Sequence, residues 1–287
     1  MKNFARQYMR TALLLAFTIV TSTAWSQSLL YKVSGSAMNN QVYIYGTIHA
    51  LPKADFFIDE RVTEKLDKAQ KVVLEIDMSS PTMVMEVQTA MIMQNNSIDK
   101  LLSSEDYSKI RQFFADSLQL PIDMLKQIKP LMLSSFMLPK LIGQESASYE
   151  TYFLQKAMEQ GKPIGGLETV AEQIGYMDKI PLDQQATMLM ESINDFNESR
   201  AEFRTLVETY KSRDVEKVYA KMMETSEEYK DFGEYLIDAR NKNWIPKIVE
   251  LANQQITFIA VGCGHLGGEK GVLNLLREQG FTVEMLK

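Results

Sequence analysis

Histidine is rare in this chain, and both histidines stand in the same sequence context. The composition gives two histidines in 287 residues. His49 follows the segment QVYIY through Gly46, and His265 follows ITFIAV through Gly262. Each segment is a short apolar run of strand length, and each meets a glycine three residues before the histidine. We therefore expect both imidazoles to lie just beyond the carboxyl ends of buried strands.

Two glutamates are expected at the same kind of position. In KVVLEID the alternation of side chains places Glu75 and Asp77 on one face at the end of a strand, and KPIGGLE ends in Glu168. In open α/β sheets, ligands bind outside the carboxyl ends of the strands. The four strand ends that carry His49, Glu75, Glu168 and His265 therefore predict a single site.

Two imidazoles and a carboxylate are suitable ligands for a divalent metal ion such as Mn, Co or Zn. We expect His49, His265 and Glu75 to hold such an ion and to activate water for hydrolysis. The sequence does not decide which of Glu75 and Glu168 is the metal ligand and which is the general base. Arg240, expected near the end of a helix and at the rim of the site, is a candidate contact for substrate or for an oxyanion.

The remaining pattern predicts an α/β fold with a central mixed sheet, in one domain over residues 27–287. Two large helical insertions are expected at about residues 81–160 and 183–253, and we expect them to wall the cavity. Ser79-Ser80-Pro81 predicts a helix start. Capping boxes are predicted at Thr169 and at Ser103.

The first 26 residues have the pattern of a secretory signal. Lys2, Arg6 and Arg10 precede the apolar run ALLLAFTIV, and Ala24-Trp25-Ser26 offers a small-x-small cleavage site. No later segment approaches the ~20 apolar residues of a membrane-spanning helix. We expect an exported protein, periplasmic or secreted, with no integral membrane segment after the signal is removed.

Charge and cysteine content exclude other classes. Loss of the three positive charges of the signal takes the formal charge from −6 to −9, and an acidic protein is a poor partner for nucleic acid. The single cysteine, Cys263, cannot form an internal disulfide. The exported chain must therefore derive its stability from its core.

The motifs resemble the TraB/GumN family, which is similar to the animal Tiki metalloproteases. The resemblance is carried by YIYGTIHALP, LEID, GGLET with Gln173, ARN, and AVGCGHLGGEKGVLNLLREQGFTV. It implies a sheet core with helical insertions and a metal-dependent, peptidase-like activity that requires both histidines and Glu75. A peptide or protein substrate is therefore expected.

Two alternatives remain open. One is a metal-free hydrolase in which a histidine and a glutamate activate water directly, because two histidines make a sparse metal site. The other is a protein that binds haem or a metal ion without catalysis. A distant resemblance to a haem-binding lipoprotein family, and Tyr43 and Tyr45 beside the first motif, favour the latter. The chain is also distantly similar to erythromycin esterases.

Overall fold

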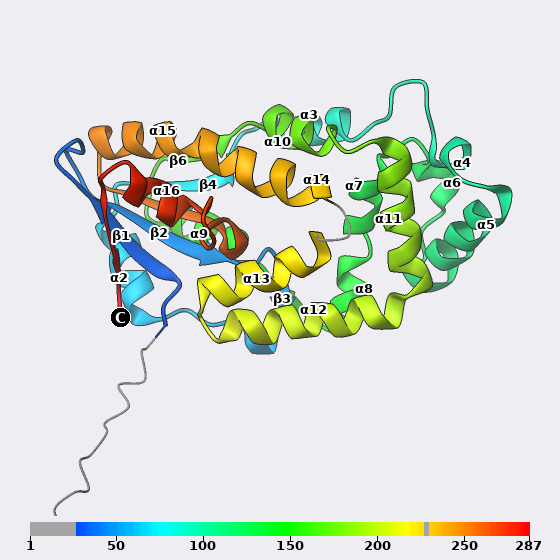
Figure 1. Cartoon of the computed structure of the whole chain (residues 1–287), viewed down its shortest axis with the longest axis horizontal. Helices are drawn as coiled ribbons and strands as arrows, with labels where there is room; N and C mark the ends of the chain where they lie inside the picture. Colours follow the sequence, from blue (N-terminus) through cyan, green and yellow to red (C-terminus); the bar gives the residue numbers. More distant parts are fainter. Residues whose placement is uncertain (1–26, 227–229) are drawn as a thin grey trace, which may run out of the picture.

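The computed structural model of the protein describes residues 27–226 and 230–287. The predicted signal, residues 1–26, lies outside the described residues. The fold is a mixed α/β arrangement in which a six-stranded sheet forms one end of the molecule and a group of helices forms the other (Figure 1). None of the helices in the described ranges combines the length and apolar character needed to cross a bilayer.

The sheet confirms the predicted fold class. Its strand order is β6-β4-β7-β2-β1-β8, in which the first four strands are parallel and the last two pair antiparallel. The bounds are β1 Leu30–Ser34, β2 Val42–Thr47, β4 Lys71–Ile76, β6 Ile164–Glu168, β7 Thr257–Gly262 and β8 Thr282–Met285. Each lies where the apolar segments of the sequence predict a strand. The four parallel strands end at one edge, which is the edge that carries the motifs.

Helices cover both faces of the sheet (Figure 1). Helices α2 (Glu60–Lys68) and α9 (Tyr149–Glu159) lie on one face, where Lys65 contacts the ring of Tyr43 and Phe153 packs against Tyr45 at 5.5 Å. Helices α15 (Ala239–Gln254) and α16 (Val272–Glu278) lie on the other. The steps from β2 to β4 and from β4 to β6 move toward one edge of the sheet, whereas the steps from β6 to β7 and from β7 to β8 move back. Because each crossover is right-handed, the helices of the two pairs of steps lie on opposite faces.

The first helical insertion forms most of a second hydrophobic core. Ile98, Ile110, Phe114 and Leu133 are fully buried there and pack with Leu189 of the second insertion. The helices are α3 Met83–Ala90, α4 Ile98–Leu101, α5 Ser104–Phe113, the π-helical turn η2 Phe114–Leu118, α6 Ile122–Leu125, α7 Pro130–Ser135, α8 Leu138–Ile142 and α11 Leu182–Asn194.

The remaining helices connect this second core to the sheet. They are α10 Val170–Met177, α12 Phe196–Lys211, α13 Val215–Ser226, α14 Lys230–Gly233 and the π-helical turn η3 Glu234–Asp238. A short pair of strands, β3 Leu51–Pro52 and β5 Ser146–Ala147, and the 3-10 turn η1 Lys53–Asp55 were not predicted. They tie the segment after the first motif to the start of α9.

Local capping signals were mostly correct. Thr169 forms the predicted capping box with Glu172, and the Ser103 hydroxyl accepts from the backbone of Asp106. The predicted helix start at Ser79-Ser80-Pro81 is wrong, because α3 begins at Met83. The side chain of Asp77 instead accepts from the backbone and hydroxyl of Ser79, which forms a turn before the helix.

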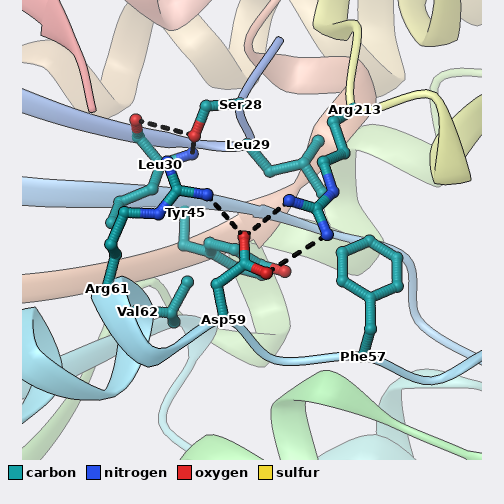
Figure 2. Close-up of a pocket in the computed structure, with 9 residues that line it drawn as sticks. All are labelled: Ser28, Leu29, Leu30, Tyr45, Phe57, Asp59, Arg61, Val62 and Arg213. Carbon is teal, nitrogen blue, oxygen red and sulfur yellow. Dashed lines mark hydrogen bonds and ion pairs between the residues drawn. The ribbon is translucent and has the colours of Figure 1, made fainter. Parts of the chain in front are cut away.

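A charged cluster fixes the turn between α12 and α13 (Figure 2). Asp59, which precedes α2, accepts hydrogen bonds from Arg61 at 2.9 Å and from both terminal nitrogens of Arg213 at 2.7 and 3.1 Å. Arg213 has a left-handed backbone, φ 60°, and its guanidinium lies over the ring of Phe57. The space between these residues measures only about 10 Å³, so the cluster is a structural clamp.

Candidate functional site

The two glycine-histidine motifs leave the same edge of the sheet side by side. Strands β2 and β7 are parallel neighbours, and their register pairs Thr47 with Gly262. His49 follows β2 by two residues, and His265 closes the short 3-10 turn η4, Cys263–His265, directly after β7. The two histidines, far apart in sequence, therefore come from neighbouring strands and lie beyond their carboxyl ends, as the strand-end pattern predicts.

Glu75 and Glu168 reach this edge from β4 and β6. Strand β4 pairs in parallel with both β6 and β7, so its end lies between the ends of those strands. Both glutamates are buried, with exposures of 5% and 6%. The structure thus brings together all four side chains that the sequence places at strand ends. Their chemical roles stay predictions.

The guanidinium of Arg240 joins the two carboxylates. Its Nη2 lies 2.5 Å from both Glu75 Oε2 and Glu168 Oε1, and its Nε donates to Glu168 at 2.9 Å. Its Nη1 donates to the Leu236 carbonyl at 3.0 Å and to Nε2 of His265 at 3.2 Å. Arg240 lies near a helix end, as predicted, but its predicted place at the rim is wrong. It is the second residue of α15 and is 6% exposed, because the carboxylates draw it inward.

His265 is held as one neutral tautomer. Its Nδ1–H donates to Oδ1 of Asn241 at 2.7 Å. The Asn241 amide cannot flip without losing the hydrogen bond from its Nδ2 to the Lys270 carbonyl, 2.9 Å. Burial lowers the pKa of His265 to about 3; Glu75 opposes this shift and Arg240 reinforces it. The lone pair of His265 therefore lies on Nε2.

His49 is anchored by Glu150, the second residue of α9. The imidazole Nδ1–H donates to Glu150 Oε1 at 3.1 Å, and the Thr47 hydroxyl donates to the same oxygen at 2.7 Å. The imidazole is 67% exposed, so it stands at the mouth of the site. Burial acts to lower the pKa of His49, but water reaches the ring and weakens that effect. The hydrogen bond to Glu150 and the charge of Glu75 raise the pKa to about 9.

Gly262 keeps open the point on which these groups converge. A Cβ at this position would lie 3.2 Å from Glu75 Oε1, 3.5 Å from His265 Cδ2 and 4.0 Å from His49 Nε2. The Gly262 N–H donates to Glu75 Oε1 at 2.8 Å. Burial acts to raise the pKa of Glu75, but the charge of Arg240 outweighs it and holds that pKa well below its usual range. Glu75 is therefore ionised.

The carboxylate of Glu168 accepts hydrogen bonds from several donors. Besides Arg240, it accepts from the Trp244 indole at 3.2 Å and from Gln173 at 3.0 Å, and Gln173 also donates to Glu75 at 3.2 Å. The Trp244 ring packs against the imidazole of His265 at 4.5 Å. Glu168 is thus placed to hold Arg240 and Trp244. Glu75 is the carboxylate near His265, with 3.9 Å between Oε1 and Nε2.

A cavity of about 200 Å³ opens beside the convergent groups. His49, Arg240, Gly262 and His265 form its polar end, and the other walls are mostly apolar and come from α12, α13 and the α14–η3 segment. The prediction that both insertions wall this cavity is wrong for the first one. Residues 81–160 bury their apolar side chains in the second core or, in α9, against the sheet, and Glu150 reaches the site through its hydrogen bond to His49.

The chemistry of the donor set fits a divalent metal ion. His265 and His49 each donate Nδ1–H to an oxygen, the arrangement that directs Nε2 of a metal-ligating histidine toward its ion. The space at Gly262 borders both rings and the ionised Glu75. Within the described part of the chain, however, no three His, Cys, Asp or Glu residues are already grouped for metal binding. The guanidinium of Arg240 holds Nε2 of His265 instead.

Three residues that shape the site were not assigned a role from the sequence. Asn241 lies within the ARN motif, so the sequence indicates that this residue matters but does not show that its partner is His265. Trp244 follows three residues later on α15, a spacing that places it on the same helix face as Asn241. Glu150 carries no such signal, because it lies in the helical insertion, 101 positions from the histidine that it contacts.

The fold and site define an α/β protein with two histidines, two glutamates and one arginine at the carboxyl edge of a parallel strand group. The chain belongs to the TraB/PrgY/gumN family, whose model matches residues 29–285. No curated protein and no solved structure matched the chain. The family match covers the sheet, both motifs and both helical insertions.

Proposed function

We propose that this protein is a metal-dependent hydrolase that cleaves peptide bonds, with His49, His265 and Glu75 as the residues that hold the ion. The observation that supports this function is the convergence of the three side chains around Gly262. The site adjoins a cavity that can receive part of a substrate. The chain's membership of the TraB/PrgY/gumN family agrees with the motif resemblance, which on its own suggests a likeness to Tiki metalloproteases.

His49, His265 and Glu75 would hold a divalent ion, and such an ion would polarise a substrate carbonyl and lower the pKa of a bound water. The chain prepares for it through Asn241 and Glu150, which orient the two rings by accepting their Nδ1–H groups. Glu75 is ionised without it, because Arg240 and the Gly262 N–H stabilise the carboxylate. Before both rings are available, Arg240 Nη1 must release Nε2 of His265, and His49, whose pKa is about 9, must lose its Nε2 proton.

Arg240 has a second role in this proposal. Its Nη2 and Nε bind carboxylates, whereas its Nη1 binds only two uncharged acceptors, the Leu236 carbonyl and the ring of His265. Since Arg240 lines the cavity, Nη1 is the group available to donate to a substrate carbonyl oxygen as negative charge develops there. Glu168 holds the guanidinium in this position.

Metal content and peptide cleavage test the proposal together. The purified protein is compared with the double variant His49→Ala, His265→Ala, and with Lys53→Ala as a matched control in which a nearby exposed side chain is removed. We expect metal content and cleavage to fall in the double variant only. Equal metal content and equal cleavage in all three proteins would rule the function out.

A metal-free hydrolase is the second candidate, and Arg240 favours it. The guanidinium already supplies a positive charge at the convergence point, where it contacts Glu75 and His265. Cleavage that survives exhaustive chelation but is lost in Glu75→Gln would establish this mechanism. Loss of cleavage on chelation, with recovery on adding Mn²⁺, Co²⁺ or Zn²⁺, would establish the metal-dependent one.

A haem-binding function has less support from the geometry. The cavity of about 200 Å³ is smaller than the roughly 300–1,000 Å³ of sites for drug-sized ligands, and a porphyrin exceeds such ligands. Tyr43 and Tyr45, which favoured haem in the sequence, are 3% and 2% exposed and pack beneath α2 and α9. A saturable Soret band on titration with hemin would reverse this conclusion.

Export completes the proposal and rests on the signal-like pattern of residues 1–26. We expect expressed protein to lose this segment and to begin at Gln27. Amino-terminal sequencing of the protein from a periplasmic or culture fraction tests this. A product that retains residues 1–26 and stays with the cytoplasm would contradict export.

A further inference from the structure

The cavity beside the histidines differs in its two halves. One end is the polar group already described, and the other is a wall of apolar side chains. That wall includes Leu206 of α12, Val218 and Met222 of α13, and Leu236 and Ile237 of η3. The catalytic assignment uses the polar end and leaves the apolar end unexplained.

The size of the cavity limits what can occupy it. A cavity of roughly 150 Å³ lined by apolar side chains accepts a benzene molecule. The present cavity of about 200 Å³ therefore has room for one side chain of the size of leucine, methionine or phenylalanine. The cavity is too small for a protein domain or for several consecutive residues of a peptide.

The charges around the cavity are already paired. Arg240 and His49 are the charged groups among the described residues that line it. The Nε and Nη2 of Arg240 bind Glu168 and Glu75, and His49 binds Glu150. A lysine or aspartate side chain placed against the apolar wall would lose its hydration without gaining a partner, which is unfavourable.

From these observations we infer that the cavity is a specificity subsite for one uncharged apolar side chain, carried by the residue next to the bond that is cleaved. This inference rests on the proposed hydrolase function, because the adjacency to His49, His265 and Gly262 is what places the side chain beside the reacting bond. Met222 and Leu206, both partly exposed, are the wall residues that set its size and polarity.

Binding tests the subsite without catalysis. The protein is labelled with ¹³C at its methionine methyl groups, and the Met222 signal is assigned by its absence in Met222→Ala. N-acetyl-leucinamide is expected to shift this signal saturably, and N-acetyl-lysinamide is expected to leave it unchanged. The Met158 methyl, which is 65% exposed on α9, serves as the internal control. A Met222 signal that stays still with leucine, or moves equally with lysine, would overturn the inference.

Cleavage of a peptide library tests what the wall residues select. Leucine, methionine or phenylalanine should be enriched on one side of the cut bond. Met222→Ala should shift the ratio of kcat/KM values by at least about tenfold toward phenylalanine over leucine, and Met158→Ala should not. Leu206→Glu should confer acceptance of lysine, whereas Thr205→Glu, exposed on the same helix, should not. Unchanged preferences in both wall variants would contradict the subsite.

The two tests separate the subsite from the hydrolase function. If leucinamide binds at Met222 but no peptide is cleaved, the proposed function fails and the apolar subsite stands. If peptides are cleaved with no apolar preference and the Met222 signal does not move, the hydrolase function stands and the subsite is wrong.

Discussion

Asn241 fixes the hydrogen-bonding state of His265. The amide oxygen lies 2.7 Å from Nδ1 of the imidazole, and the amide nitrogen is bound to the Lys270 carbonyl. Because an amide oxygen only accepts, the proton of the ring must be on Nδ1. The nitrogen that faces Glu75 and Arg240 is therefore a base.

Asn241→Ala should lower activity by about 10–100-fold, since the ring loses the partner that sets its tautomer and orientation. The buried Nδ1–H would also be left without an acceptor, at a cost of about 1–3 kcal/mol in the free energy of unfolding. Kinetics and ¹⁵N chemical shifts of the imidazole measure the two effects. Asn243→Ala on the same helix is the control. An imidazole that keeps its Nδ1–H tautomer in Asn241→Ala would refute the argument.

Arg240→Met should reduce the free energy of unfolding by about 3–5 kcal/mol, because two buried carboxylates would lose their shared cation. Urea unfolding gives the value. The matched control is Arg204→Met, which removes an exposed arginine from α12. A loss as small as that of the control would show that Glu75 and Glu168 do not depend on Arg240.

Stability should fall as the pH drops from 6.5 toward 4.5. The pKa of His265 is about 3 in the folded protein and near 6.5 when unfolded, so the unfolded chain binds an extra proton in this range. The slope approaches about 1.4 kcal/mol per pH unit for one proton. The lowered pKa of Glu75 acts only below about 4.5, outside this range. His265→Asn, compared by unfolding in chelator, should flatten the slope; an unchanged slope would contradict it.

On the alkaline side the sign reverses for His49. Its pKa is about 9 in the folded protein, so its contribution to stability is complete below 6.5 and is lost as the pH rises toward 9. Between pH 6.5 and 8 the unfolding midpoint of the wild type should therefore decrease. His49→Asn should remove this decrease, because Glu150 then has no imidazolium partner at any pH. Parallel curves for the two proteins would exclude this assignment.

Gly262→Ala should abolish activity while leaving the fold intact. The added methyl would lie 3.2 Å from Glu75 Oε1 and would fill the point between the two imidazoles. Gly262 does not have a left-handed backbone, φ −51°, so alanine introduces no backbone strain there. Gly175→Ala, in a helix where the methyl meets no atom within 4 Å, is the matched control and should be active. Full activity in Gly262→Ala would show that the space is not used.

The sequence was most informative where a residue type and a local pattern coincided. Both histidines follow short apolar runs that end in glycine, and the rule that parallel strands bind ligands at their carboxyl edge was enough to group them with Glu75 and Glu168. The capping box at Thr169 depends only on residues three positions apart, so it too was predictable.

Long-range contacts account for what the sequence did not predict. An arginine in a charged helical segment is usually solvated. No residue near Arg240 in the sequence shows that it binds two buried carboxylates. Glu150 reaches His49 only because β3 and β5 bring the start of α9 to the end of β2. The separate core of the first insertion arises from its pairing with α11, which is equally nonlocal.

Strand β7 lies between β4 and β2, yet it follows both of them in the chain, after the two helical insertions. Without it, β2 and β4 have no shared neighbour, and the sheet lacks its centre. A nascent chain therefore cannot complete the centre of this sheet before β7 has been synthesised. Any chain that stops before His265 lacks both the central strand and the second histidine. Completion of the central sheet and completion of the site therefore require the same segment, β7 and the turn that carries His265.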